Sequence, residues 1–329
     1  MSADIRDFGK LANGRVIRVI TLRAGELTAR VLTLGATLQD LRLAGTPWPL
    51  VLGSDLPGAY AGRLSWCGAV VGPVANRIGG AQARIADQDY RFPPNDGENL
   101  LHSGDDGVSG LIWDIAEATG DAVTLQCDLA HGFGGFPGAR VIRATYRIAP
   151  PATLEITLTA QSDRETLVNL AHHPYWNLDG TGTTSGHSLS VAADRILPTA
   201  DGLPLAPVPV EGTPYDLRRA QPLPDLPPLD HNYCLDASDN LRPVARLTGE
   251  RGVTLVLETD APGLQVYDGR ALDSAPYPGL TGQPYKAHAG IALEPQLWPD
   301  APNHPDFPSI VLPAGQQWRQ ETRYTLSRA

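Results

Sequence analysis

The sequence predicts an all-β protein, a large antiparallel β-sandwich with few or no long helices, in which residues 1–329 form a single domain. Apolar and polar residues alternate in several segments, and this period of two is typical of strands with one buried face. No long window repeats apolar residues with helical spacing. The 34 glycines and 30 prolines are scattered along the chain, as many short strands and turns require. The chain is long for one domain, but large all-β folds often exceed the usual length.

The clearest strands are expected in the segments 123–128, 142–148 and 154–160, where alternation is strict. Pro150 and Pro151 separate the last two segments and favour a turn over a central strand. The proline-rich segment from Leu203 to Pro228 is predicted to be a long irregular excursion, a kind of loop that often has a function.

Composition and charge exclude several classes of protein. The formal net charge of −10 argues against a nucleic-acid partner, because phosphate binding needs a basic surface. The first ten residues lack the apolar core of a signal peptide, and no apolar stretch reaches the roughly 18 residues of a membrane span. We therefore expect a cytoplasmic protein with no membrane partner. Three widely spaced cysteines, expected to be buried thiols, form no Cys-x-x-Cys pair: Cys67, Cys127 and Cys234.

Five segments concentrate polar residues that can carry chemistry: VGPVANRIGG (71–80), ENLLHSG (98–104), NLAHHPYWNLDG (169–180), PLDHNYCL (228–235) and GIALEPQLWPDAPNHPDFPS (290–309). Strand alternation in the last segment places Ala292, Glu294 and Gln296 on one face. Alternation before Pro174 places His173 on the more polar face and His172 on the opposite one. His173, rather than His172, should therefore line a cleft.

Taken together and in this order, the segments resemble the aldose 1-epimerase (galactose mutarotase) family. The resemblance extends from Asn13-Gly14 to FPSIVLPAGQQW (307–318) and includes GFPG (135–138), GTPYDLR (212–218) and LQVYDG (264–269). It implies a galactose mutarotase-like supersandwich. It also implies interconversion of the α and β anomers of a free aldose such as galactose or glucose, with no metal, nucleotide or other cofactor.

The resemblance also implies roles for individual residues. Opening a hemiacetal ring requires a base for the O1 proton and an acid for the ring oxygen. The family's motifs place the base at Glu294 and the acid at His173, and a carboxylate and an imidazole in different environments suit that division. A monosaccharide offers many hydroxyl groups and little charge, so polar side chains should hold it. The expected substrate-binding residues are Asn76, Arg77, His102, Asp230 and Gln296.

Several positions beside these residues depart from the family pattern and leave the preferred sugar open. They are Pro73, His172, Pro174, Pro295 and Asp268. Aromatic side chains could stack on a sugar, although most tryptophans are expected in the core. The candidates are Trp66, Tyr175, Trp176, Tyr267 and Trp298.

Other interpretations stay open at this point. A non-catalytic carbohydrate-binding protein could share the fold, because fold alone does not prove activity. A sugar-phosphate epimerase would need further cations beside Arg77, such as Arg63, Arg218 and Arg270. Arg77 could instead form a structural ion pair, and Asp230 could form a turn. A metal site is disfavoured because the histidines lack metalloprotease-type spacing. The chain could be a monomer or a homodimer.

Overall fold

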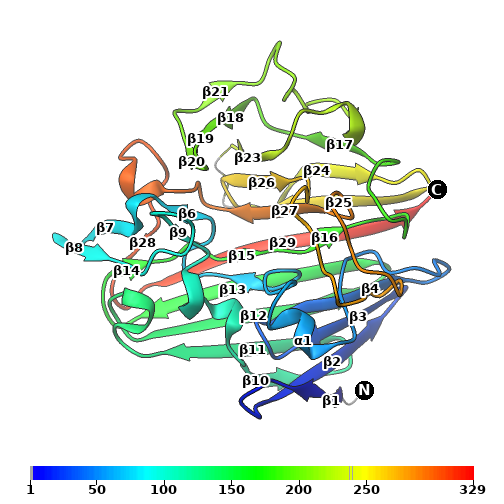
Figure 1. Ribbon diagram of the computed structural model, residues 1–329, viewed down its shortest axis with the longest axis horizontal. Coiled ribbons are helices and arrows are strands. Elements are labelled where there is room, and N and C mark those ends of the chain that lie inside the picture. The colour runs from blue at the N-terminus through cyan, green and yellow to red at the C-terminus, as the bar shows by residue number, and fades with distance from the viewer. Residues whose placement is uncertain (1–2, 237, 239) are drawn as a thin grey trace.

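The computed structural model describes residues 3–236, 238 and 240–329, and strands dominate it (Figure 1). Within this part of the chain the only α-helix is α1 (Pro57–Tyr60), which has four residues. Short 3-10 turns interrupt the loops: η1 (Gly79–Ala81), η2 (Gly104–Asp106), η3 (Val108–Gly110), η4 (Phe133–Gly135), η5 (Leu223–Asp225) and η6 (Ala301–Asn303). The all-β prediction is confirmed. No helix in the described residues is long and apolar enough to cross a membrane.

The largest sheet has nine antiparallel strands, and it contains all three segments predicted from strict alternation. Along each of those segments buried and less buried residues alternate, so one face packs inward. In order across the sheet the strands are β10 (Asp114–Ala118), β11 (Ala122–Leu129), β12 (Arg140–Ala149), β13 (Thr153–Ser162), β29 (Gln317–Arg328), β25 (Val253–Thr259), β24 (Arg242–Thr248), β17 (Ser188–Val191) and β22 (Gln221–Pro222).

Two further sheets complete the main layers. The six-stranded sheet has the order β16 (Tyr175–Trp176), β27 (Ile291–Gln296), β26 (Gly263–Tyr267), β23 (Asp230–Cys234), β18 (Arg195–Leu197) and β21 (Val208–Pro209). The four-stranded sheet consists of β1 (Asp4–Lys10), β2 (Val16–Ala24), β3 (Leu27–Leu32) and β4 (Leu38–Leu43).

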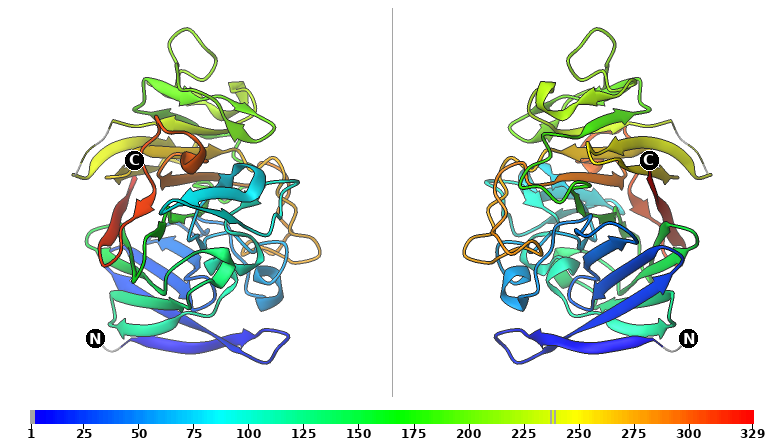
Figure 2. Two further views of the ribbon diagram at one scale, coloured as in Figure 1. Left: turned by 90° about the vertical axis from the view of Figure 1, so that its left-hand side faces the viewer. Right: turned by 90° about the vertical axis from the view of Figure 1, so that its right-hand side faces the viewer.

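Five short strand pairs lie outside these three sheets. They are β5 (Val70–Val71) with β15 (Ala171–His172), β6 (Arg77–Ile78) with β9 (Leu100–Leu101), β7 (Gln82–Ile85) with β8 (Gln88–Arg91), β14 (Thr166–Leu167) with β28 (Val311–Leu312), and β19 (Thr199–Ala200) with β20 (Leu203–Pro204). In both views of Figure 2, the cyan segments around β6 and β9 lie on the same side of the molecule as the orange loop after β26.

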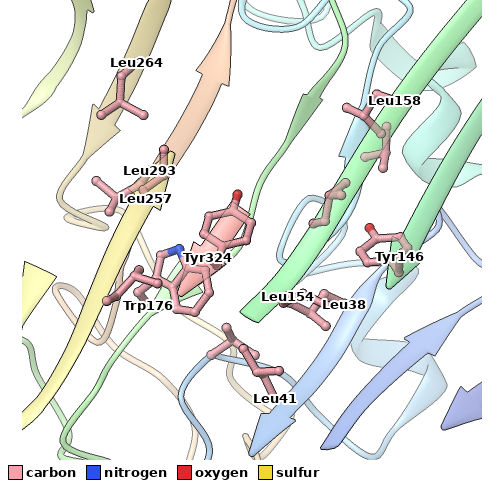
Figure 3. Packing of buried hydrophobic residues seen from close by; sticks show 14 of the residues in the cluster. Leu38, Leu41, Tyr146, Leu154, Leu158, Trp176, Leu257, Leu264, Leu293 and Tyr324 are labelled. Carbon is pink, nitrogen blue, oxygen red and sulfur yellow. The ribbon is translucent and has the colours of Figure 1, made fainter. Parts of the chain in front are cut away.

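The core lies between the sheets and is built around large aromatic side chains. Trp176 and Tyr324 are fully buried with ring centroids 4.9 Å apart, and Figure 3 shows them among leucines from several layers. Tyr146 is also fully buried, and its hydroxyl donates a 2.6 Å hydrogen bond to the carbonyl of Ala36. Each such ring removes about 150–250 Å² from water, so these residues contribute strongly to the stability of the sandwich.

The proline-rich segment 203–228 is more regular than predicted. It contains β20, β21, β22 and η5, and each of the three strands has only two residues and includes a proline. Proline has no N–H to donate, which restricts it to the edges of sheets. Accordingly β21 ends the six-stranded sheet and β22 ends the nine-stranded one. The turn predicted at Pro150 and Pro151 is confirmed, because β12 ends at Ala149 and β13 begins at Thr153.

The strand order joins parts of the chain that are far apart in sequence. β29 lies between β13 and β25, so the middle of the nine-stranded sheet pairs distant segments. Thr153 and Thr325 face each other there, 172 residues apart, with their hydroxyl groups at 3.0 Å.

Candidate active site

Six of the seven predicted site residues line one cavity of about 460 Å³, a size that suits a small molecule. Its walls come from segments that are widely separated in sequence: the β6 and β9 region, the end of β15, and strands β23, β26 and β27. The predicted residues that meet there are Asn76, Arg77, His102, His173, Asp230 and Glu294.

Glu294 and His173 face each other in this cavity. The distance between Glu294 Oε1 and His173 Nε2 is 3.4 Å, and both side chains are at most 5% exposed. The N–H of His173 donates to the carbonyl of Ala69, which fixes the backbone after β15. Asn169 exchanges two hydrogen bonds with the backbone of Leu297, at 2.8 and 3.1 Å. These two hydrogen bonds hold the segment that contains His173 against the end of β27.

Burial disfavours charge on both members of this pair. It raises the pKa of Glu294 well above its usual value, and the nearby negative charge of Asp230 adds to the effect. It lowers the pKa of His173 to about 4. Burial therefore favours a protonated carboxyl group beside a neutral imidazole, so the favoured state of the pair holds one proton, on Glu294.

His102 reaches the cavity through a strained local backbone. Both His102 and Asn76 have positive φ angles, of 50° and 58°, which is uncommon for residues other than glycine. Two hydrogen bonds hold this arrangement: the His102 N–H donates to the Asn76 carbonyl at 2.9 Å, and the Asn76 N–H donates to His102 Nδ1 at 3.1 Å. Because Nδ1 is an acceptor, the neutral ring carries its hydrogen on Nε2. Burial, followed by the charges of His173 and Arg77, lowers the pKa of His102 well below its usual value. His102 can therefore offer a ligand one neutral N–H donor.

Arg77 combines the two alternatives that its sequence context allowed. Its Nε donates a 2.7 Å bond to Asp96 Oδ2, so it does form an ion pair, and it lines the cavity as well. Gly202 packs closely against the guanidinium, because a Cβ at this position would lie 2.9 Å from Arg77 Nε. The ion pair and this contact fix the orientation of the guanidinium while it faces the cavity.

Asp230 is held by a residue that sequence reasoning missed. Gln265 lines the cavity, and its Nε2 donates a 2.7 Å bond to Asp230 Oδ1. Gln265 lies opposite Glu294 in the pairing of β26 with β27. The available signal was a lone polar residue between Leu264 and Val266 in an otherwise apolar strand.

The aromatic candidates divide between cavity and core. Trp66, Tyr175 and Tyr267 line the cavity. Trp176 is fully buried in the core, and the Trp298 indole donates to the Pro262 carbonyl at 2.8 Å. The structure thus brings three of these five side chains to the cavity.

Gln296 requires a correction, because it does not line the cavity. It shares the face of Glu294 as alternation predicts, but it lies one rung further along β27, opposite Gly263. Its side chain there is completely buried. His172 is also buried away from the cavity, with its Nδ1 3.3 Å from the Tyr324 hydroxyl, which agrees with the predicted orientation of the two histidines.

A second hollow of about 740 Å³ is larger but has no comparable chemistry. It lies along residues 213–226 and includes Arg218, whose guanidinium is 2.7 Å from Asp216 and 3.3 Å from Asp194. Its main cation is thus neutralised by surface carboxylates. In the described residues no group of three or more histidine, cysteine or acidic side chains is arranged to hold a metal ion. All three cysteines are free and buried, as predicted.

The fold and the cavity together define a β-sandwich protein with a buried carboxyl–imidazole pair in a polar cavity. The family model "Aldose 1-epimerase" matches residues 18–325. The chain is 33% identical over 338 residues to the galactose mutarotase of Rattus norvegicus, with 98% of each chain covered. It is 30% identical to the aldose 1-epimerase of Escherichia coli K12, over 95% of this chain and 96% of the relative.

Solved structures agree with this result. The aldose epimerase homologue from C. elegans superposes with a TM-score of 0.88 at 29% identity, covering 94% of this chain and 99% of that one. The galactose 1-epimerase of Lactobacillus acidophilus shares the fold, with a TM-score of 0.86 at 24% identity over 100% and 99% of the two chains. The chain belongs to the aldose 1-epimerase family.

Proposed function

We propose that this protein interconverts the α and β anomers of a free aldose by opening and reclosing the sugar ring, with Glu294 and His173 as the acid–base pair. The observation that carries the proposal is the 3.4 Å contact between these two buried side chains at the wall of one polar cavity. Binding alone would not require such a pair, so this contact favours an enzyme over a non-catalytic carbohydrate-binding protein.

The single proton of the pair is enough for a complete reaction cycle. In the ring-opening step ionised Glu294 removes the O1 proton while protonated His173 delivers a proton to the ring oxygen, and the C1–O5 bond breaks. The pair then consists of a protonated carboxyl and a neutral imidazole, the state that burial favours. After rotation about C1–C2 the two transfers reverse and the ring closes on the other face. No net proton enters or leaves the pair during turnover.

The remaining cavity residues supply hydrogen bonds for the sugar hydroxyl groups. His102 offers a neutral N–H, the Arg77 guanidinium offers donors in a fixed orientation, and Asp230 offers an acceptor. Asn76 helps to position both His102 and Arg77. The backbone N–H of Arg77 donates a 2.9 Å hydrogen bond to Asn76 Oδ1. Tyr175 and Trp66 give the cavity apolar surface for the C–H faces of a sugar.

The charge balance of the cavity favours a neutral sugar over a sugar phosphate. Three arginines line it (Arg63, Arg77 and Arg270), but Asp230 and Asp273 line it as well, and Asp96 is paired with Arg77. The Arg270 guanidinium is bound to Asp268 at 3.1 Å, and the guanidinium of Arg218 lies in the other hollow. A phosphate group would need an excess of cations that this arrangement does not provide.

Polarimetry tests the proposal directly. Freshly dissolved α-D-glucose or α-D-galactose is expected to reach its equilibrium rotation faster with the protein than with buffer alone. A panel that adds arabinose, xylose and fucose then identifies the preferred aldose. If no sugar in the panel is accelerated by correctly folded protein, the proposed activity is wrong.

A further inference from the structure

Behind Glu294, on the same face of the six-stranded sheet, lies a group of buried polar side chains that do not line the cavity. Gln296 follows Glu294 by one rung on β27, and Asn232 lies on β23. Cross-strand pairing places Glu294, Gln265 and Asn232 side by side in one row across three strands. Asn232 is 1% exposed and Gln296 is completely buried, so bulk water reaches neither.

Gly263 allows the two amides to approach each other. It pairs with Gln296, and a Cβ at this position would lie 2.6 Å from Asn232 Oδ1. The carboxamide of Asn232 therefore occupies the place that a side chain at position 263 would take. This brings the Asn232 amide beside Gln296, one rung behind the carboxyl group of Glu294.

Several side-chain atoms of Gln296 and of this row have no hydrogen-bond partner in the described part of the chain. They are Glu294 Oε2, Gln265 Oε1, Asn232 Oδ1, and both Nε2 and Oε1 of Gln296. A buried polar atom without a partner is costly, so native proteins rarely leave several together unless a bound water molecule joins them. A polar group with two to four available partners is the environment in which buried water binds.

We propose that Gln296 and Asn232 are positioning residues that hold a buried water molecule against Glu294 Oε2 and thereby stabilise the ionised carboxylate during catalysis. Gln296 Nε2 is the N–H donor of the group, and the water molecule passes its hydrogen bond on to the carboxylate. Asn232 Oδ1 accepts from the same water molecule and fixes it in place. This inference rests on the proposed function, and it replaces the expected contact of Gln296 with the sugar.

The other titratable groups around Glu294 are accounted for. His173 contacts it directly, and Asp230 opposes its ionisation through negative charge. The phenols of Tyr175 and Tyr324 also lie close enough to interact with its charge, and both are kept neutral by burial. His102 lies beyond His173, with ring centroids 5.4 Å apart. None of these groups donates a hydrogen bond to Oε2 in the described structure. The buried amides of Gln296 and Asn232 are therefore what can oppose the effect of burial on this oxygen.

A ¹³C NMR titration of the glutamate carboxyl groups tests the proposal, with the Glu294 signal identified by its loss in Glu294→Gln. Gln296→Met keeps the side-chain length and removes the donor. A hydrogen bond to a charged group is worth about one to two pH units of proton affinity, so the Glu294 midpoint is expected to rise by at least about one unit. Mutarotation should fall by roughly tenfold per unit, because the ionised base becomes rarer.

Gln320→Leu is the matched control. Gln320 is also a buried glutamine beside β27, but its Nε2 donates to the Pro295 carbonyl at 3.0 Å and it does not belong to the row. Gln320→Leu should lower the melting temperature, because this hydrogen bond is lost, and should not change the titration midpoint of Glu294. Asn232→Ala, on a different strand, should raise the midpoint by a smaller amount than Gln296→Met.

The proposal is overturned if both Gln296→Met and Asn232→Ala, or whichever of them folds, keep the midpoint within about 0.3 pH units of the parent. This outcome is distinct from failure of the proposed function. The titration measures the proton affinity of Glu294 in the absence of sugar. A parent protein that does not accelerate mutarotation would contradict the proposed function but would not change the result of the titration.

Discussion

Glu294→Gln is expected to abolish most activity and at the same time to stabilise the protein above about pH 5. Glutamine has nearly the same shape as the protonated carboxyl group, so packing around β27 should persist. The variant removes the proposed base, and loss of a general base typically lowers turnover by about 10²- to 10⁴-fold. The free energy of unfolding should instead increase, because Glu294 is buried at 2% exposure and favours its neutral form.

The size of the stability gain follows from proton linkage. The unfolded glutamate ionises near 4.5, whereas burial raises the pKa of Glu294 in the folded protein. Between these two values the folded state binds a proton at Glu294 that the unfolded state has lost, so the contribution of this residue to the free energy of unfolding falls as pH rises. The slope contributed by this residue is at most about 1.4 kcal/mol per pH unit. Glutamine has no such proton, so the gap between variant and parent should widen by up to about 3 kcal/mol over the first two units.

Urea unfolding of both proteins at several values between pH 4 and pH 8 measures this gap, and polarimetry on the same samples measures turnover. Glu117→Gln supplies the control, because Glu117 is an exposed residue on β10. It should change neither turnover nor the pH dependence of stability. A gap that stays constant or narrows as pH rises would refute the neutral buried carboxyl, and near-normal turnover in Glu294→Gln would refute its role as base.

Three other predictions concern the same cavity and its supports. His173→Asn should lower mutarotation by roughly 10²-fold in polarimetry. Because the pKa of His173 falls from 6.5 to about 4 on folding, its own contribution to the free energy of unfolding rises by up to about 3 kcal/mol between pH 4 and pH 6.5, and urea unfolding should show that the difference between parent and variant changes by this amount. Asp96→Asn should weaken the ion pair that orients Arg77 and raise KM more than it lowers kcat, and equal effects on both would contradict a binding role. Asp179→Ala should cost about 3 kcal/mol in chemical unfolding without changing kcat of the folded fraction, because this buried carboxylate accepts the backbone N–H groups of Glu250 and Arg251 at 3.0 and 2.9 Å.

Strand periodicity predicted the parts of the structure that depend on one strand at a time. It gave the large antiparallel sheet and the inward orientation of His173, since side chains alternate strictly along a strand. The same rule placed Gln296 on the face of Glu294. It could not show that Gly263 and Asn232 cover this rung, because that depends on which strands become neighbours.

The meeting of the cavity residues had a different origin. Nothing in the local pattern brings Arg77, Asp230 and Glu294 together, and this expectation came from the family resemblance alone. Gln265 was missed because one polar residue in an apolar strand carries no information about its partners. The strained backbone at Asn76 and His102 could not be predicted from the sequence either, because two reciprocal hydrogen bonds between separate segments stabilise it.

The central position of β29 has a consequence for how inactive variants should be interpreted. Thr153 and Thr325 are 172 positions apart and can meet only after the chain between them has folded into place. That stretch carries His173, Asp230, Gln265 and Glu294, and non-local pairing of this kind is typical of slow-folding proteins, so we expect the cavity to depend on correct assembly of the nine-stranded sheet. A random screen for loss of activity would therefore recover many substitutions in strands far from any sugar, whose defect is failed assembly rather than failed proton transfer.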